Sequence, residues 1–501
     1  MKLRNGRSYI ESLRDGREVY INGERVVDVT THPAFRQTIR SFAALYDYQA
    51  DEKNRELMTI VSPTSGGRVS RAWELPTNLE SLVRRREALT ALARLHHGFL
   101  GRAPDHLATT LSAMLMGIEV FRRNGADRAK AFEAYFEYVR DNDLFVTYVI
   151  QNPQADKTVT ASGQARDLVA RIVAQDEHGI TVQGAKMLGT SAVMADELLV
   201  ANIQPLQPGE ERYAFSCALP VATKGLRFLS RRSYEESATS EFDYPLSSTL
   251  DENDAIVYFD QVKVPWERVF LIGDIAAVRQ QWSETPAHVY QNYQSQIRLM
   301  VKLQFLAGVA RRVAETTSAI NIPQVKAALS NLAAQATLVE CMVYGMEAAA
   351  VSLGPYVVPP AHLLYAAQIY SQDIYPKFLQ SIRELAGGGL IMSPSSVKDF
   401  AHSELARMID ETQVSSVTDS VGRVKIFKLA WDAIGSEFGS RHLQYEMFYG
   451  GAAYVNQANM FRTFDWEAAL GEVDRRLDRM GAPDRSSQPT AVPFGEAVLH
   501  G

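Results

Sequence analysis

The chain has 501 residues and carries 52 Lys and Arg against 58 Asp and Glu, a net charge of −6. Its apolar fraction of 46% is that of an ordinary globular protein, and the mild acidity argues against a dedicated nucleic-acid binder. Two cysteines, Cys217 and Cys341, are too few for a disulfide scaffold or a zinc site of the CxxC type.

The N-terminal residues carry charges every few positions and lack the apolar core of a signal peptide. No stretch approaches the roughly 18 uncharged apolar residues of a transmembrane helix. We therefore expect a cytoplasmic protein without membrane contacts.

Residues 1–150 are expected to form a mainly helical N-terminal domain. Residues 77–80 fit a capping box led by Thr77, which starts an amphipathic helix that continues to about Phe99. Gly101 and Pro104 interrupt this helix, so the residues around them are expected at a helix end or in a loop.

Residues 151–275 change in character and are expected to form a middle β domain. Short runs rich in β-branched and aromatic residues recur at near-regular spacing, which is typical of a small sheet or barrel. The expected strands lie at residues 168–175, 180–183, 197–202, 213–219, 226–230 and 255–264.

Helical periodicity returns after residue 275 and predicts a helical bundle over residues 276–480. The Pro-, Ser- and Gly-rich residues 481–501 are expected to form a surface arm. The order of helical, β and helical parts indicates an α+β fold. The long helices are expected at residues 291–320, 323–352, 361–386 and 419–449.

Local signatures of common chemistry are missing from the sequence. There is no GxGxxG or GxxxxGK[ST] loop for a dinucleotide or a nucleotide, no HExxH and no GxSxG. The ten histidines and two cysteines show no metal-ligand spacing, so we expect no metal.

Five longer segments are nevertheless distinctive. In this order, over about residues 3–475, they closely resemble the 4-hydroxyphenylacetate 3-monooxygenase family, the oxygenase component of two-component flavin monooxygenases. The segments are the N-terminal NGRSYIESLRDGREVYINGERVVDVTTHPAFR, GRAPDH (101–106), DLFVTYVIQNPQAD (143–156), FDYPLSSTLDENDAIVYFDQVKVPWERVF (242–270) and RVKIFKLAWDAIGSEFGSRHLQYEMFYGG (423–451).

The resemblance implies an acyl-CoA-dehydrogenase-like fold: an N-terminal helical domain, a middle β-barrel and a C-terminal four-helix bundle, usually assembled as a homotetramer. It also implies FAD bound as FADH2 and supplied by a separate NAD(P)H:flavin reductase, which agrees with the missing dinucleotide loop. In the family, O2 and the reduced flavin form a C4a-hydroperoxide that hydroxylates a small aromatic substrate beside a phenol oxygen.

Three residues match the positions at which the family holds the phenol oxygen. Arg102 matches the family's arginine, whereas His106 stands in place of a tyrosine and Tyr148 in place of a histidine. We hypothesise that Arg102 holds the substrate oxygen as an anion, that His106 is the base or hydrogen-bond acceptor and that Tyr148 donates a hydrogen bond. The alternative is that His106 only caps a helix end or bonds a backbone carbonyl.

The resemblance also assigns flavin contacts to three segments. Thr190 matches a threonine that bonds the N5 side of the flavin, although its hydroxyl could instead satisfy its own backbone at a strand end. Lys157 stands where the family usually has arginine, which loosens an expected phosphate contact. The full set is Gln154, Ala155, Asp156, Lys157, Leu188, Gly189, Thr190 and, from a neighbouring subunit, Gly450, Gly451 and Tyr454.

Ungapped counting places Ile203 and Gln204 where the family binds the substrate carboxylate, and a one-residue gap would bring Asn202 there. Because isoleucine cannot bind a carboxylate, we expect a neutral or larger phenol or a heteroaromatic compound. Residues 205–212 match a lid that orders when the substrate binds.

Other functions stay open on the sequence alone. The same flavin chemistry could act on an N-heteroaromatic or a halo- or nitro-aromatic substrate. The chain could also be a flavin oxidoreductase of the acyl-CoA-dehydrogenase type, or a tetrameric scaffold without catalytic activity.

Overall fold

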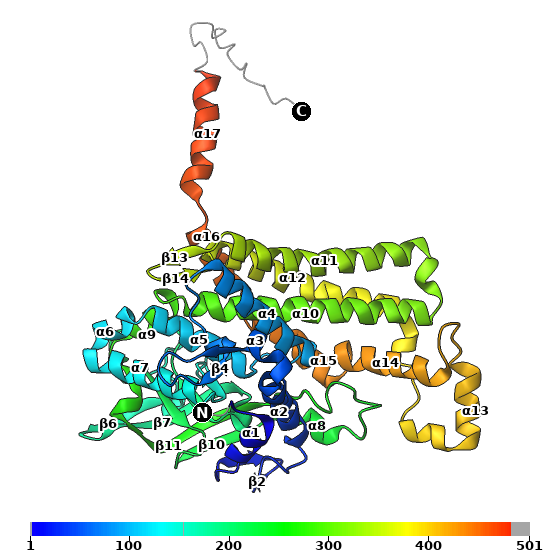
Figure 1. Cartoon of the computed structure of the whole chain (residues 1–501), viewed down its shortest axis with the longest axis horizontal. Helices are drawn as coiled ribbons and strands as arrows, with labels where there is room; N and C mark the ends of the chain where they lie inside the picture. Colours follow the sequence, from blue (N-terminus) through cyan, green and yellow to red (C-terminus); the bar gives the residue numbers. More distant parts are fainter. Residues whose placement is uncertain (1–2, 154, 482–501) are drawn as a thin grey trace, which may run out of the picture.

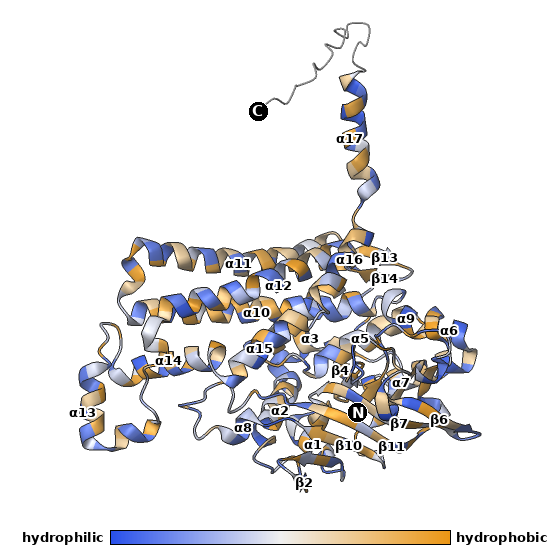
Figure 2. Ribbon diagram, turned by 180° about the vertical axis from the view of Figure 1, so that it is seen from behind, coloured by the Kyte–Doolittle hydropathy of each residue, from blue (hydrophilic) through white to orange (hydrophobic). Residues whose placement is uncertain are grey.

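The computed structural model describes residues 3–153 and 155–481 of the chain. The strands of its two larger sheets gather at one end beneath a layer of long helices, and the last helix, α17 (Trp466–Met480), stands away from the rest (Figure 1). Figure 2 shows the same arrangement from behind. The expected arm over 481–501 lies outside the described residues, apart from Gly481.

The N-terminal segment is mainly helical but also contributes strands. Strands β3 and β4 form a separate hairpin, whereas β1 and β2 join the large sheet of the middle part. The elements are α1 (Gly6–Ser12), β1 (Glu18–Ile21), β2 (Glu24–Val26), α2 (Arg36–Ala50), α3 (Arg55–Met58), β3 (Thr59–Val61), β4 (Arg68–Ser70), α4 (Leu79–Leu95), α5 (Pro104–Met116), α6 (Glu119–Asn124) and α7 (Ala126–Asp141).

The capping box of α4 is shifted by one residue from the predicted one. Asn78, and not Thr77, is the N-cap: its side chain accepts a hydrogen bond from the Ser81 amide at 2.8 Å, and its own amide donates to the Ser81 hydroxyl at 3.3 Å. The helix ends at Leu95, four residues before the predicted end, and Pro104 then opens α5.

The middle part holds two sheets, with strand orders β2-β1-β10-β11-β7-β6 and β12-β9-β8-β5. Neighbours are antiparallel except for the parallel pairs β1–β10 and β5–β8. Among the described residues both sheets stay open, so the closed barrel expected from the family is not found. The strands are β5 (Val146–Val149), β6 (Arg171–Asp176), β7 (Gly179–Thr190), β8 (Glu197–Val200), β9 (Phe215–Pro220), β10 (Leu226–Ser230), β11 (Asp254–Pro265) and β12 (Val269–Ile272).

The C-terminal part is helical as predicted, but the helix expected at 419–449 is two helices. Gly435 packs closely on the Trp431 ring, and the Ser436 side chain starts a new helix by accepting a hydrogen bond from the Gly439 amide. The short α8 (Tyr234–Ser237) still belongs to the middle part, between β10 and β11. The elements of the C-terminal part are α9 (Ile275–Ser283), α10 (Ala287–Thr316), α11 (Pro323–Ala348), β13 (Val351–Leu353), β14 (Tyr356–Val358), α12 (Ala361–Ala386), α13 (Ser403–Thr412), α14 (Ser420–Ile434), α15 (Glu437–Phe448), α16 (Ala453–Thr463) and α17.

Helix α10 is the central element. It packs against α11, α12 and α14 and also against α4 and α5 of the N-terminal part. Every residue from Tyr290 to Leu303 is buried, including Arg298 and Lys302. Because buried polar side chains need partners, this stretch points to the functional centre of the molecule.

No described helix is both long and apolar enough to cross a bilayer. The proposed boundaries at residues 150 and 275 stay predictions, although β1 and β2 already show that the N-terminal segment and the middle sheet share one structure.

Substituting the two candidate cap residues tests the start of α4. Asn78→Ala should destabilise the helix by about 1 kcal/mol because the Ser81 amide of the first turn loses its partner, whereas Thr77→Ala should change little. Hydrogen exchange of the α4 amides reports the loss. Equal exchange in the two variants would contradict the assignment of the cap.

Candidate active site

Arg102, His106 and Tyr148 lie together at the start of α5. Arg102 belongs to the turn before the helix and His106 to its first turn, while Tyr148 comes from β5. The Arg102 guanidinium carbon lies 4.2 Å from the centre of the Tyr148 ring, and the ring centres of His106 and Tyr148 are 5.3 Å apart. The structure thus brings together the three residues that the sequence assigned to the phenol oxygen.

Glu252 fixes the turn that carries Arg102. Its Oε2 accepts hydrogen bonds from the backbone amides of Gly101 at 2.8 Å and Arg102 at 2.9 Å. Position 101 has no room for a side chain, because a Cβ there would lie 2.1 Å from Tyr445 Oη. Pro104 needs no amide partner, so the chain enters α5 directly from this turn.

Arg102 and His106 hold buried polar atoms that lack a partner in the described part of the chain. Within residues 3–153 and 155–481, neither ring nitrogen of His106 and neither Nε nor Nη1 of Arg102 has a hydrogen-bond partner. The His106 side chain therefore caps no helix and bonds no described backbone carbonyl. Because unpaired buried polar groups are costly, the cluster is suited to a ligand that supplies the missing partners.

Tyr449 forms a further wall of the cluster that the sequence did not reveal. Its ring centre lies 5.7 Å from that of His106 and 5.2 Å from the guanidinium carbon of Arg102. Tyr445, one turn earlier on α15, packs on it with ring centres 4.9 Å apart. The sequence signal was two tyrosines four residues apart, which fits any packed helix.

Gln291 on α10 is a second residue that the sequence did not indicate. Its Nε2 donates to Tyr148 Oη at 2.8 Å. One lone pair of the Tyr148 oxygen is thereby occupied, and the hydroxyl proton stays available for another acceptor. Trp282 from α9 packs edge-on to the same ring, with centres 6.2 Å apart.

Burial sets the protonation of the cluster. It lowers the pKa of His106 well below its usual range, and the guanidinium groups of Arg102 and Arg298 lower it further. Burial also raises the pKa of Tyr148. At neutral pH the site therefore offers one neutral imidazole that can accept a hydrogen bond, one phenol that can donate one and one permanent cation.

Beneath the tyrosines lies a buried ion cluster. Both carboxylate oxygens of Glu446 bind Arg298 at 2.7 Å, and Lys302 lies 2.9 Å from one of them. The Arg298 guanidinium carbon is 5.3 Å from the Tyr449 ring centre, so this cluster supports the floor of the site. Burial alone would raise the pKa of Glu446, but the two cations outweigh it and lower that pKa to about 2.

Thr190 is the last residue of β7 and lies beside β5, the strand that carries Tyr148. Its carbonyl accepts from the Thr147 hydroxyl at 2.9 Å, next to Tyr148 in the chain, and its own hydroxyl donates to Asp254 at 2.6 Å. The hydroxyl therefore does not satisfy its own backbone, which was the alternative. Leu188 and Ser191 both have φ near 59°, a left-handed conformation unusual away from glycine, and Gly189 packs against Val257.

Ala155, Asp156 and Lys157 lie exposed in the loop that follows β5, while Gln154 lies outside the described residues. The Asp156 carboxylate accepts from the amide and hydroxyl of Thr158 at 2.8 and 2.6 Å, which lowers its pKa. The loop thus presents its side chains to solvent, and its flavin contacts stay a prediction.

Gln204 is held by the chain itself. Its Oε1 accepts from the Asn152 amide at 2.9 Å, and the neighbouring Ile203 is 39% exposed. Asn202 is buried, and its Nδ2 has no partner among the described residues. The Asn152 side chain in turn accepts from Lys186, so polar contacts join the loops after β5 and β8.

Gly450 and Gly451 lie against α12. Gln368 donates to the Gly450 carbonyl at 3.3 Å and Gln372 to the Gly451 carbonyl at 2.7 Å. Tyr454, at the start of α16, is 73% exposed and points away from the cluster's buried interior. These residues directly follow Tyr449, so the segment borders the site, and its contact with a flavin of another subunit stays a prediction.

Comparison with known proteins agrees with this geometry. The family models described as 4-hydroxyphenylacetate 3-hydroxylase N terminal and C terminal match residues 5–271 and 278–478. The chain belongs to this family.

Similar members include the 4-hydroxyphenylacetate 3-monooxygenase oxygenase component of Geobacillus sp. (strain PA-9), 34% identical over 90% of this chain and 92% of the relative. The pyoverdin chromophore biosynthetic protein PvcC of Pseudomonas aeruginosa is 35% identical over 90% of both chains. The crystal structure of the oxygenase component HpaB of 4-hydroxyphenylacetate 3-monooxygenase, complexed with FAD and 4-hydroxyphenylacetate, is similar with a TM-score of 0.90. It is 32% identical, over 95% of this chain and 99% of that one. The acyl-CoA-dehydrogenase-like α+β fold expected from the family is therefore confirmed.

The donor set of the family site fits a flavin and a phenol better than a metal. Thr190 presents a hydroxyl oxygen, and Arg102 and His106 present buried atoms that lack protein partners. No group of three or more His, Cys, Asp or Glu among the described residues could hold a metal ion.

Removing the anion of the buried cluster should destabilise the protein. Glu446→Gln leaves Arg298 and Lys302 buried without a counter-charge, and we expect a loss of about 3–5 kcal/mol in the free energy of unfolding, measured by chemical denaturation. The loss should be full at neutral pH. It should shrink below the ordinary glutamate pKa of 4.5, because the wild type itself loses this contribution as the pH falls toward 2.

Glu411→Gln provides the control, since it removes an exposed ion pair with Arg407. It should cost no more than about 0.5 kcal/mol. Similar losses in the two variants would show that the Glu446 cluster does not carry the stability assigned to it.

Proposed function

We propose that the chain is the oxygenase component of a two-component monooxygenase that uses FADH2 and O2 to hydroxylate a phenolic or related aromatic substrate. The observation that carries the proposal is the buried cluster of Arg102, His106 and Tyr148, in which polar atoms of Arg102 and His106 lack partners among the described residues beside the rings of Tyr148 and Tyr449. The named activities of the relatives and the FAD in the HpaB structure support it.

The cluster offers each group that activation of a phenol needs. A substrate ring is held among the rings of Tyr148, His106 and Tyr449, with its oxygen toward Arg102. The phenol donates a hydrogen bond to a ring nitrogen of neutral His106, and the Arg102 cation stabilises the negative charge that develops on the substrate oxygen. This charge makes the ring carbon beside the oxygen more nucleophilic.

Reduced FAD, once bound, supplies the activated oxygen that this carbon attacks. The chain's own part is to orient the ring and to keep water away. Gln291 occupies one lone pair of Tyr148 Oη, which directs the Tyr148 proton toward the substrate oxygen. Residues 205–212 are proposed to close over the substrate as a lid.

The substrate is proposed to be a neutral or larger phenol or a heteroaromatic compound. Gln204 is already bound to Asn152, and Ile203 offers no polar group, so neither supports binding of a small carboxylate. The unpaired amide of Asn202 can donate to a polar substituent. A halo- or nitro-aromatic substrate remains the alternative, and the varied names of the relatives support this breadth.

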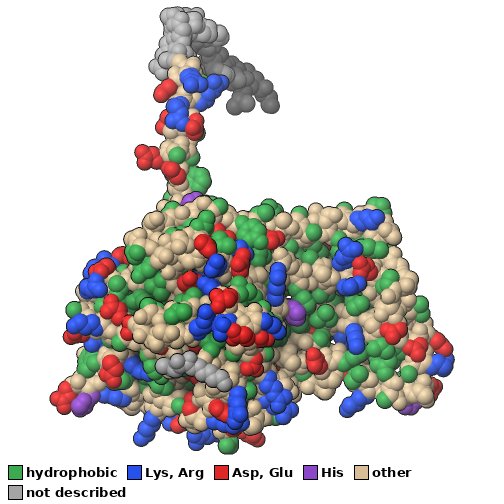
Figure 3. Space-filling model, in the orientation of Figure 1, with side chains coloured by type: hydrophobic (Ala, Val, Ile, Leu, Met, Phe, Trp, Pro, Cys, Tyr) green, Lys and Arg blue, Asp and Glu red, His purple; other side chains and the backbone are tan. Residues whose placement is uncertain are grey.

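The proposed partners are a separate NAD(P)H:flavin reductase and further copies of this chain. The Geobacillus relative is named as an oxygenase component, which supports a reductase on another chain. The reaction is proposed to take place in the cytoplasm. The homotetramer is supported by α17, which projects from the body (Figure 3). Its exposed apolar residues alternate at steps of four and three, the spacing of a packed helix: Trp466, Leu470, Val473, Leu477 and Met480.

Substitution of His106 tests the chemistry. His106→Ala should lower the rate of product formation at least about 100-fold while the variant still consumes FADH2 and releases hydrogen peroxide, because only the proton acceptor is lost. Anaerobic mixing with FADH2 followed by an oxygen pulse and a panel of phenols measures both products. His178→Ala, in an exposed hairpin, is the control. Full coupled hydroxylation by His106→Ala would refute the role of this residue.

Flavin retention and the need for a reductase distinguish the rival function from the proposed one. An oxidoreductase of the acyl-CoA-dehydrogenase type would retain FAD through purification and turn over without a reductase. Neither behaviour is expected here.

Charged substitutions on α17 test the assembly. Leu470→Glu with Leu477→Glu should convert the tetramer into smaller species, measured by light scattering after size-exclusion chromatography, because the apolar stripe can no longer be buried between copies. Arg475→Glu, on the opposite face of the helix, should leave the mass unchanged. A tetramer that survives the double substitution would exclude α17 from the contact.

A further inference from the structure

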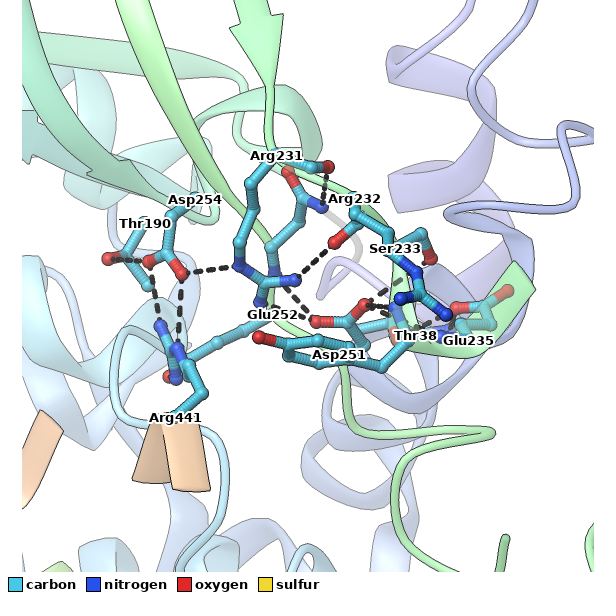
Figure 4. A network of polar contacts seen from close by, with 12 residues as sticks. Thr38, Thr190, Arg231, Arg232, Ser233, Glu235, Asp251, Glu252, Asp254 and Arg441 are labelled. Atoms are coloured by element: carbon cyan, nitrogen blue, oxygen red, sulfur yellow. Dashed lines mark hydrogen bonds and ion pairs between the residues drawn. The ribbon is translucent and has the colours of Figure 1, made fainter. Parts of the chain in front are cut away.

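The hydroxyl of Thr190 has a fixed donor direction. Its Oγ1 lies 2.6 Å from Oδ1 of Asp254, and the two residues pair across β7 and β11 (Figure 4). A carboxylate can only accept hydrogen bonds, so the proton between these oxygens belongs to Thr190. With its only proton directed at Asp254, the Thr190 oxygen can use its lone pairs only to accept hydrogen bonds from other groups.

Asp254 stays ionised because two arginines hold it. Arg441 reaches both carboxylate oxygens, at 2.7 and 3.0 Å, and Arg231 lies 2.8 Å from Oδ2. Burial alone would raise the pKa of Asp254, but the two guanidinium groups outweigh it and hold that pKa well below its usual range. The carboxylate therefore never offers a proton to Thr190 under ordinary conditions.

Each of the two arginines also binds a second carboxylate. Arg231 also binds Asp251 at 2.7 Å, and Asp251 accepts from the Tyr234 amide. Arg441 also binds Glu252 at 2.6 Å, the same carboxylate that fixes the Arg102 turn. Figure 4 shows these groups as one continuous network, so neither Asp254 nor the direction of the Thr190 hydroxyl is free to change.

We propose that Asp254 is a positioning residue that makes Thr190 a hydrogen-bond acceptor and thereby selects reduced over oxidised flavin. The inference rests on the proposed function and on Thr190 facing the N5 edge of the flavin. In reduced flavin N5 carries a hydrogen and donates to such an oxygen. In oxidised flavin N5 is itself an acceptor, so two lone pairs would face each other. A chain that takes its flavin from a reductase needs this preference, because it must exclude spent FAD.

The test compares the affinities for the two redox forms. The full-length protein is titrated anaerobically with FADH2 and, separately, with FAD, and the ratio of the two dissociation constants is taken. The wild type should prefer FADH2. Thr190→Val keeps Asp254 and its arginines but removes the acceptor, so it should weaken FADH2 binding about tenfold, the effect of one hydrogen bond, and should not weaken FAD binding.

Asp254→Asn tests the direction of the bond itself. The asparagine amide can donate to Thr190, which frees the threonine proton to face N5, so the preference for FADH2 should fall about tenfold. A general loosening of the site would weaken both forms alike and leave the ratio as it was. Thr190→Ser retains the hydroxyl and should keep the wild-type ratio. The double variant Thr190→Val with Asp254→Asn should show the ratio of Thr190→Val alone.

The outcomes separate this inference from the function on which it rests. A wild type that binds neither form of FAD would overturn the proposed function and this inference with it. A wild type that prefers FADH2, with the same ratio in Thr190→Val, would overturn this inference alone. Equal affinity of the wild type for FADH2 and FAD would likewise overturn this inference and leave the proposed function standing.

Discussion

The guanidinium group of Arg441 joins two carboxylates that serve opposite sides of the site. Through Asp254 it holds the hydroxyl at the end of β7, and through Glu252 it holds the turn that carries Arg102. The side chain comes from α15, so the helical part of the molecule and the sheet meet at one buried cation. Charge-assisted bonds of this kind are short and directional, and they transmit the position of one element to the next.

A second group of charges lies on the other side of the aromatic floor. Arg298, Lys302 and Glu446 hold α10 against α15, the helix that provides Tyr445 and Tyr449. Replacing such a cluster with apolar residues often costs no stability. Its presence in the core is therefore better explained by its fixing α15 against α10 than by a net gain in the free energy of unfolding. The cation of Arg298 also helps to keep His106 neutral, which links the packing of the bundle to the chemistry of the pocket.

Much of the fold could be predicted from local patterns. The helix at 361–386 and the strand at 226–230 have the predicted bounds, because periodicity and turn residues are local properties. The break at Gly435 was missed, since a serine cap inside an apolar run resembles an ordinary helix position. Resemblance identified Arg102, His106 and Tyr148. Tyr449 and Gln291 carry no local signal, because only the packing of α15 and α10 brings them to the site.

The parallel pairing of β1 with β10 has a consequence for how the chain is made. Glu18 lies beside Arg227, about 200 residues later in the sequence. At the usual pace of synthesis, roughly 5–20 residues per second, the ribosome needs about 10–40 seconds to deliver that partner. During this interval the edge of β1 that pairs with β10 in the folded protein has no partner. The nascent chain is therefore most exposed to wrong strand pairing, and to chaperone binding, before β10 is synthesised.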